Sequence, residues 1–114
     1  MHELLATDNI NSENLEILLK ARENGKADFL LVDVREDMEY EMEHLKGVDM
    51  LKPTSDFQSW AQALFDEAKD RVIIFTCRTG NRSGQIQNVF SSNGHSKVIN
   101  HFGGIVSYRG DIER

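Results

Sequence analysis

The chain has 114 residues, a length that suits one domain built around one hydrophobic core. Apolar residues make up 39% of it and charged residues 28%, proportions of a globular protein that exclude disordered, collagen-like and coiled-coil chains. The net charge of −6 argues against a non-specific nucleic-acid binder, and the single cysteine excludes a disulfide framework and a multi-thiolate metal site.

The first expected helix begins near Asn11 or Ser12, either of which can cap it, and ends near Gly25. Its apolar residues recur at helical spacing and are Leu15, Leu18 and Leu19. The continuous apolar run that follows, residues 29–32, suits a strand that is buried on both faces, as strands of parallel sheets are.

The middle of the chain contains a charged stretch and an amphipathic stretch. Residues 35–43 are typical of a short exposed helix, and residues 48–51 are expected to form another short strand. After Pro53 a helix is predicted whose apolar side carries Phe57, Trp60, Ala61, Leu64 and Phe65. The second clear buried strand is residues 72–75.

The last third repeats the same alternation. A helix through Ile86, Val89 and Phe90 should end near Asn93-Gly94, a last strand covers residues 97–99, and an amphipathic turn follows Gly103-Gly104. Strands that alternate with helices predict an α/β fold, with a parallel sheet and helices on both faces. We expect residues 1–114 to form a single domain.

The sequence also bears on where the protein resides. No segment reaches the roughly 18 apolar residues of a membrane span. Acidic residues stand where a signal peptide would carry its basic region, so we expect a cytoplasmic protein.

The loop after the second buried strand has the composition of an anion-binding turn. Cys77 lies at the carboxyl end of that strand, where ligands bind in open α/β sheets. The residues after it are Arg78, Thr79, Gly80, Asn81, Arg82 and Ser83. Such a short strand-to-helix loop can turn successive N–H groups inward, with Gly80 allowing a positive φ and Ser83 as the expected helix N-cap.

This setting predicts an ionised, nucleophilic thiol. Inward amides, a helix N-terminus and two guanidinium groups each favour the thiolate and so lower the pKa of Cys77. The alternative is that Cys77 is a small buried hydrophobic residue that closes a strand. Polar, basic and glycine residues directly after it disfavour that alternative.

Three stretches of the chain resemble the rhodanese family of sulfurtransferases. The loop of residues 77–83 resembles the family's active-site loop, and Val32-Asp33-Val34-Arg35-Glu36 with Glu39-Tyr40 and residues 44–48 resembles its upstream signature. Residues 102–105 with Tyr108 resemble its closing motif. The departures are Glu43 for the usual glycine, Val48 for alanine and Tyr108 for tryptophan, which concern packing.

The resemblance implies a five-stranded parallel sheet flanked by helices and a double displacement that needs no cofactor or metal. Cys77 would take a sulfane sulfur from a small anion, namely thiosulfate, a polysulfide or a persulfide. The Cys77 persulfide would pass that sulfur to cyanide, a thiol or an acceptor protein. Residues 78–83 would form the cradle, Arg78 and Arg82 would attract the anionic donor, and Asp33 and Arg35 would support the site mainly as a structural pair.

Other functions fit parts of the same pattern. A cysteine-dependent phosphatase or arsenate reductase of related fold would place five residues between its cysteine and arginine, whereas here there are four, residues 78–81. A protein-to-protein sulfur carrier uses the same cysteine, and a non-catalytic partner-binding module commonly lacks it. The four histidines share no spacing that predicts a metal site; we expect His44 to be structural and His101 to lie in an exposed loop.

Overall fold

The computed structural model describes residues 2–114 and contains a five-stranded sheet in which all neighbouring strands are parallel. In the order of the sheet the strands are β1 (Asn9–Ile10), β6 (Val98–His101), β5 (Ile73–Thr76), β2 (Leu30–Asp33) and β4 (Met50–Leu51). The structure confirms the expected α/β fold with a five-stranded parallel sheet.

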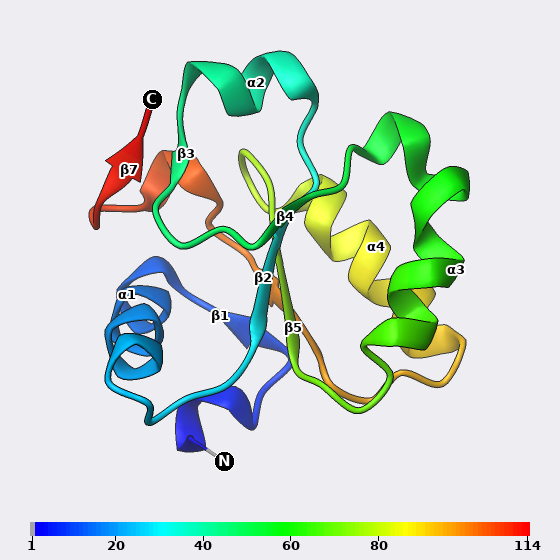
Figure 1. The fold of residues 1–114 in the computed structure, drawn as a ribbon, viewed down its shortest axis with the longest axis horizontal. Helices are drawn as coiled ribbons and strands as arrows, with labels where there is room; N and C mark the ends of the chain where they lie inside the picture. Colours follow the sequence, from blue (N-terminus) through cyan, green and yellow to red (C-terminus); the bar gives the residue numbers. More distant parts are fainter. Residues whose placement is uncertain (1) are drawn as a thin grey trace.

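Helices cover both faces of this sheet (Figure 1). Helix α1 (Ser12–Glu23) lies on one face, and α3 (Phe57–Glu67) and α4 (Asn81–Ser92) lie on the other. The side chain of Asn11 caps α1 by accepting a 2.8 Å hydrogen bond from the amide of Asn14, as predicted. Gly25, just after the helix, has φ +73°, the left-handed conformation that the sequence led us to expect at its end.

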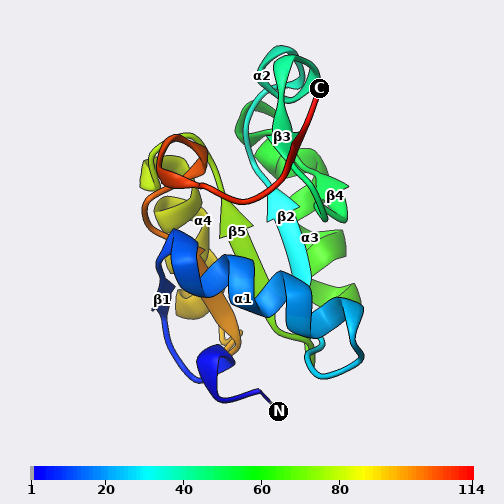
Figure 2. The same ribbon diagram turned by 90° about the vertical axis from the view of Figure 1, so that its left-hand side faces the viewer.

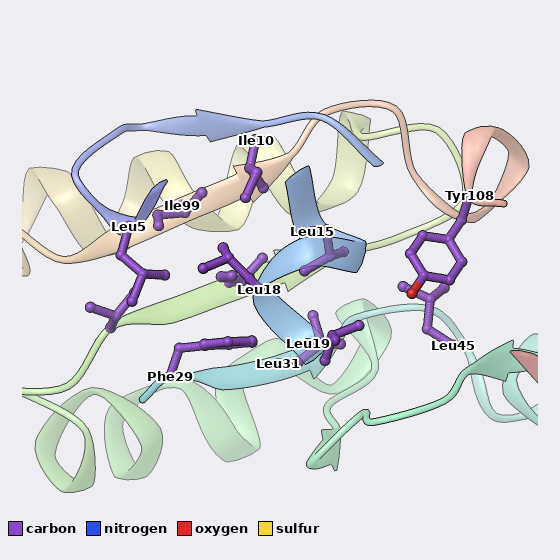
Figure 3. Close-up of a cluster of buried hydrophobic side chains, with 12 residues drawn as sticks. Leu5, Ile10, Leu15, Leu18, Leu19, Phe29, Leu31, Leu45, Ile99 and Tyr108 are labelled. Carbon is purple, nitrogen blue, oxygen red and sulfur yellow. The ribbon is translucent and has the colours of Figure 1, made fainter. Parts of the chain in front are cut away.

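Two hydrophobic clusters fill the spaces between the sheet and its helices. Leu15, Leu18 and Leu19 of α1 pack on β2, β5 and β6 in the first cluster (Figure 3). Trp60 and Leu64 of α3 belong to the second cluster, together with Ile86 and Phe90 of α4. Phe57 and Phe65 are only partly buried at the edge of this second cluster. Val89, which the helical pattern placed with Ile86 and Phe90, is instead 43% exposed, so the periodicities identified most but not all of the buried positions.

The structure corrects the bounds of two predicted elements. The charged stretch forms α2 over Asp37–Met42 only, and no residue of this helix is buried. The strand predicted for residues 48–51 is limited to β4, where both residues are only partly buried.

Three strands had no sequence signal because each has only two residues. One is β1, and the others are β3 (His44–Leu45) and β7 (Ile112–Glu113), which pair in an antiparallel ribbon. Three 3₁₀ turns complete the fold: η1 (Glu3–Leu5), η2 (Thr54–Asp56) and η3 (Ile105–Ser107).

The parallel register brings polar residues together at the carboxyl ends of three strands. Asp33 of β2 pairs in register with Thr76 of β5, and Asn100 of β6 pairs with Phe75. Helix α2 and the β3–β7 ribbon lie beyond this edge of the sheet (Figure 2). The loop that follows β5 therefore lies beneath α2.

The prediction that His101 lies in an exposed loop is wrong. His101 is the fully buried last residue of β6. Strand β6 ends two residues beyond the predicted strand of residues 97–99, which carries the imidazole into the core. Its Nδ1 lies 2.8 Å from the hydroxyl of Thr76, and its Nε2 lies 2.7 Å from that of Ser12. Burial lowers the pKa of His101 to about 4, so the imidazole is neutral at physiological pH.

This depressed pKa makes the stability of the fold dependent on pH. The pKa of His101 falls from 6.5 to about 4 on folding, so the unfolded chain binds more protons between these values. The stability present above pH 6.5 should therefore decrease as the pH falls towards 4, by roughly 3 kcal/mol in total. Urea unfolding of the wild type and of His101→Gln across this range measures the effect. The variant should lose this part of the pH dependence, and identical slopes for both proteins would contradict the assignment.

Candidate active site

The sulfur of Cys77 lies at the centre of the loop that joins β5 to α4. The Sγ atom is 3.1 Å from the amide nitrogen of Gly80 and 3.5 Å from that of Ser83, and both amides donate to it. The hydroxyl of Ser83 lies 3.3 Å from the same sulfur. Cys77 is only 1% exposed, so hydrogen-bond donors of the loop, rather than water, surround its sulfur.

Gly80 makes this geometry possible. Its φ of +99° is a left-handed conformation that costs other residues roughly 1–2 kcal/mol. A Cβ at this position would also overlap the backbone carbonyl of Phe102. Gly80 occupies the N-cap position of α4, so the prediction that Ser83 caps this helix is wrong. Ser83 lies inside the first turn, where its buried side chain points at the sulfur instead.

Backbone bonds to the neighbouring turn hold the loop carbonyls away from the sulfur. The amide of Ile105 donates to the carbonyl of Cys77 at 2.9 Å, and that of Val106 donates to the carbonyl of Arg78 at 3.2 Å. Gly104 allows this close approach, since a Cβ there would overlap the backbone of Arg78. The Arg78 carbonyl shares a peptide unit with the amide of Thr79, so turning that carbonyl outward turns the Thr79 amide towards the sulfur.

These donors favour the thiolate. Burial by itself raises the pKa of Cys77, but hydrogen bonds from the Ser83 side chain and from the amides of Ser83, Gly80 and Thr79 outweigh it. The net effect lowers the pKa below that of a free thiol. The expected direction is confirmed, with hydrogen bonds of the loop as the cause.

The two arginines of the loop have different surroundings. Arg82 forms a bidentate ion pair with Glu39 of α2, with N–O distances of 2.6 and 3.0 Å. Hydrogen bonding from Arg82 lowers the pKa of Glu39 to about 2, against an opposing effect of burial. Arg78 is exposed and forms no ion pair with any residue of the range 2–114. The positive charge available to an incoming anion is therefore mainly that of Arg78.

Asp33 and Arg35 form a buried pair at the end of β2. The guanidinium of Arg35 donates to both carboxylate oxygens of Asp33, and it donates to the carbonyl of Glu43 at 2.7 Å. The pair thus ties the end of β2 to the segment after α2. None of these contacts involves Cys77.

The histidines and acidic residues form no candidate metal site within the described part of the chain. The Nδ1 atom of His44 lies 3.0 Å from the carbonyl of Tyr40, and the two rings stack with centroids 3.8 Å apart. This contact agrees with a structural role for His44.

Two residues of the site were not predicted from the sequence. Glu39 was noted only as part of a motif, and its pairing with Arg82 depends on where α2 lies. Asn100 is buried beneath the loop and bonds to both Ser83 and Gly80. A polar residue within an otherwise apolar run, residues 98–100, was the signal that could have identified it.

The likeness of this chain to known proteins covers most of its length. A family model described as a rhodanese-like domain matches residues 14–111. The chain is 36% identical over 81 residues to a chloroplastic protein of Arabidopsis thaliana that contains rhodanese-like and PpiC domains. This match covers 68% of the chain but 26% of that relative, so the chain spans about a quarter of its length.

Solved structures show the same fold. A rhodanese-like domain protein from Staphylococcus aureus matches 94% of this chain and 97% of its own, with a TM-score of 0.74 and 21% identity. A rhodanese-related protein from Thermoplasma volcanium matches 90% of each chain, with a TM-score of 0.69 and 25% identity.

No helix within residues 2–114 has the length and apolar character needed to cross a bilayer.

The loop geometry predicts a large effect of Gly80→Ala. The change should destabilise the fold by roughly 2 kcal/mol more than Gly94→Ala and should raise the pKa of Cys77. Gly94 is a matched control, because its φ of +101° is close to that of Gly80 but its Cβ would meet nothing within 4 Å. Chemical unfolding and the ultraviolet absorbance of the thiolate measure the two effects. Equal destabilisation by both changes would show that the contact with Phe102 is unimportant.

Proposed function

We propose that this chain, which belongs to the rhodanese-like domain family, is a sulfurtransferase that carries a sulfane sulfur as a persulfide on Cys77. The observation that carries the proposal is the buried sulfur held by the amides of Gly80 and Ser83 and by the Ser83 hydroxyl. This arrangement stabilises an ionised sulfur, which is the form that attacks a donor.

The reaction consists of two displacements. In the first, the Cys77 thiolate attacks the outer sulfur of thiosulfate, a polysulfide or a persulfide. A bond forms between Sγ and that sulfur, and the donor's sulfur–sulfur bond breaks, so that sulfite, a shorter polysulfide or a thiolate, respectively, leaves with the electron pair. In the second, cyanide, a thiol or a cysteine of an acceptor protein attacks the outer sulfur of the persulfide, and the Cys77 thiolate leaves.

The N-terminus of α4 supports the charged persulfide. The first amides of a helix have no partner within it, and the amide of Ser83 already donates to Sγ. The amides of Asn81 and Arg82 have no acceptor within residues 2–114. They are available to the outer sulfur, which carries the negative charge after transfer.

Arg78 supports the binding of an anionic donor. A surface hollow of about 410 Å³ adjoins the loop at Arg78, and its walls include the apolar side chains of Met42, Ile105 and Val106. Because Arg82 is paired with Glu39, the guanidinium of Arg78 is the group best placed to attract a donor.

Replacing the nucleophile should abolish the reaction and preserve the fold. The Cys77→Ser change removes the only thiol, so intact mass spectrometry should detect one added sulfur on the wild type after exposure to thiosulfate or polysulfide, and none on the variant. Circular dichroism should be the same for both proteins. Turnover of phosphate or arsenate esters by the wild type, without a sulfur adduct, would favour a phosphatase or arsenate reductase instead.

Removing the charge of Arg78 should weaken donor binding. We expect Arg78→Gln to raise KM for thiosulfate about fivefold at low ionic strength, with a smaller effect on kcat. Arg71→Gln is the control, because Arg71 precedes β5 at the opposite end of the sheet and is also exposed. Steady-state kinetics at two salt concentrations tests this. A KM that is equally sensitive to both changes would exclude a specific role for Arg78.

A further inference from the structure

We propose that Asn100 is a positioning residue that controls the ionisation of Cys77 by competing with its sulfur for the hydroxyl hydrogen of Ser83. Asn100 is in β6, its side chain is nearly buried, and it lies beneath the loop rather than in it. Its side chain bonds to Ser83 and Gly80 and not to the sulfur, so its influence on Cys77 passes through those two residues.

The orientation of the Asn100 amide follows from its partners. The carbonyl of Gly80 can only accept a hydrogen bond, so the group that faces it at 3.2 Å is the Nδ2 donor. The Oδ1 acceptor therefore faces the hydroxyl of Ser83, at 2.6 Å. Since Oδ1 carries no hydrogen, the hydrogen between these two oxygens belongs to Ser83.

This bond limits what Ser83 offers the sulfur. A serine hydroxyl has one hydrogen, and here it is directed at Asn100. The oxygen thus presents a lone pair to Sγ at 3.3 Å, which suits a protonated thiol as a donor. In this arrangement the thiol, the hydroxyl and the amide are all hydrogen-bonded.

Loss of the thiol proton to water changes that balance. A thiolate can only accept, so the Ser83 hydroxyl must rotate its hydrogen towards Sγ to bond with it. This rotation leaves the buried Oδ1 atom of Asn100 without a hydrogen-bond donor, which is unfavourable. Asn100 therefore opposes the thiolate, while the amides of Gly80 and Ser83 favour it.

The consequence for sulfur transfer rests on the proposed function. In the persulfide, Sγ is bonded to the outer sulfur and the negative charge resides mainly on that outer atom. Ser83 can then return its hydrogen to Asn100, and the buried amide is satisfied again. Asn100 thus destabilises the unloaded thiolate relative to the persulfide and favours loading of Cys77.

Other charged and titratable groups near the sulfur do not account for this effect. Arg82 on α4 is paired with Glu39 on α2, Asp33 and Arg35 on β2 are paired with each other, and Arg78 in the loop is exposed. The neighbouring His101 bonds to Thr76 and Ser12 instead. Within residues 2–114, no side-chain hydrogen bond joins any of these charged groups or His101 to Ser83 or Asn100.

A double-mutant cycle on the thiol pKa tests the competition. The sole cysteine allows the pKa of Cys77 to be read from the ultraviolet absorbance of its thiolate. Asn100→Leu should lower this pKa by about one unit, because it frees the Ser83 hydroxyl for the sulfur. In a Ser83→Ala background the same change should lower the pKa by about one unit less, because no hydroxyl is left to be freed. The lost bond to the Gly80 carbonyl is common to both backgrounds and cancels in the cycle.

Asn100→Asp is a second variant that preserves the side-chain volume. It retains an acceptor towards Ser83 and adds a negative charge, so the pKa of Cys77 should rise. The proposal is overturned if Asn100→Leu shifts the pKa equally in both backgrounds, or if Asn100→Asp leaves it unchanged. Circular dichroism of every variant monitors the fold.

A loading measurement separates this inference from the proposed function. The measurement is made at a pH above the pKa of Cys77 and at a fixed ratio of polysulfide to thiol in solution. Under these conditions the ratio of persulfide to thiolate on Cys77 should fall about tenfold in Asn100→Leu. An unchanged ratio, with persulfide formed, would overturn the effect on loading. Absence of any wild-type persulfide would refute the proposed function, whereas the pKa cycle would still decide whether Asn100 controls the ionisation of Cys77.

Discussion

The structure at the carboxyl edge of the sheet depends on one constraint, which is that the backbone around Cys77 must present its amides to the sulfur. Three separate parts of the chain enforce this. Gly80 adopts a positive φ, the turn at Ile105 and Val106 binds the loop carbonyls, and Asn100 binds the carbonyl of Gly80 from below. Because each contact directs a carbonyl away from the sulfur, the sulfur is left among donors and its thiolate is stabilised although it is buried.

The charges around the loop are arranged so that few remain free. Glu39 neutralises Arg82, and Asp33 binds Arg35 inside the protein. An unpaired buried charge would be costly, and the Asp33–Arg35 pair avoids that cost, while the partly exposed Arg82–Glu39 pair joins α2 to the loop. The stabilisation of the thiolate therefore comes from backbone amides at close range, together with the Ser83 hydroxyl when its hydrogen turns from Asn100 to the sulfur. The exposed Arg78 is left to act on molecules that approach from outside.

Two buried polar residues of β6 lie at the same carboxyl edge of the sheet as the loop. Asn100 and His101 are adjacent on β6, and alternation along the strand directs them to opposite faces of the sheet. Asn100 faces the loop and α4, whereas His101 bonds towards α1 through Ser12. One short strand thus supports the reactive loop from one face and links the sheet to its first helix from the other.

Periodicity and local motifs were enough to predict the α/β class, most of the buried helical positions and Cys77 as the candidate nucleophile. These features depend on neighbours along the chain, such as Gly80 and the polar residues after β5. The partners of Arg82, the burial of His101 and the position of Asn100 beneath Ser83 emerge only when the chain is folded. Each of these involves residues far apart in sequence, and the register of β5 with β6 and the placement of α2 bring them together. Of the two-residue strands, β1, β3 and β7 also needed tertiary structure, because so short a segment has no periodicity to read, whereas β4 lies within the strand predicted for residues 48–51.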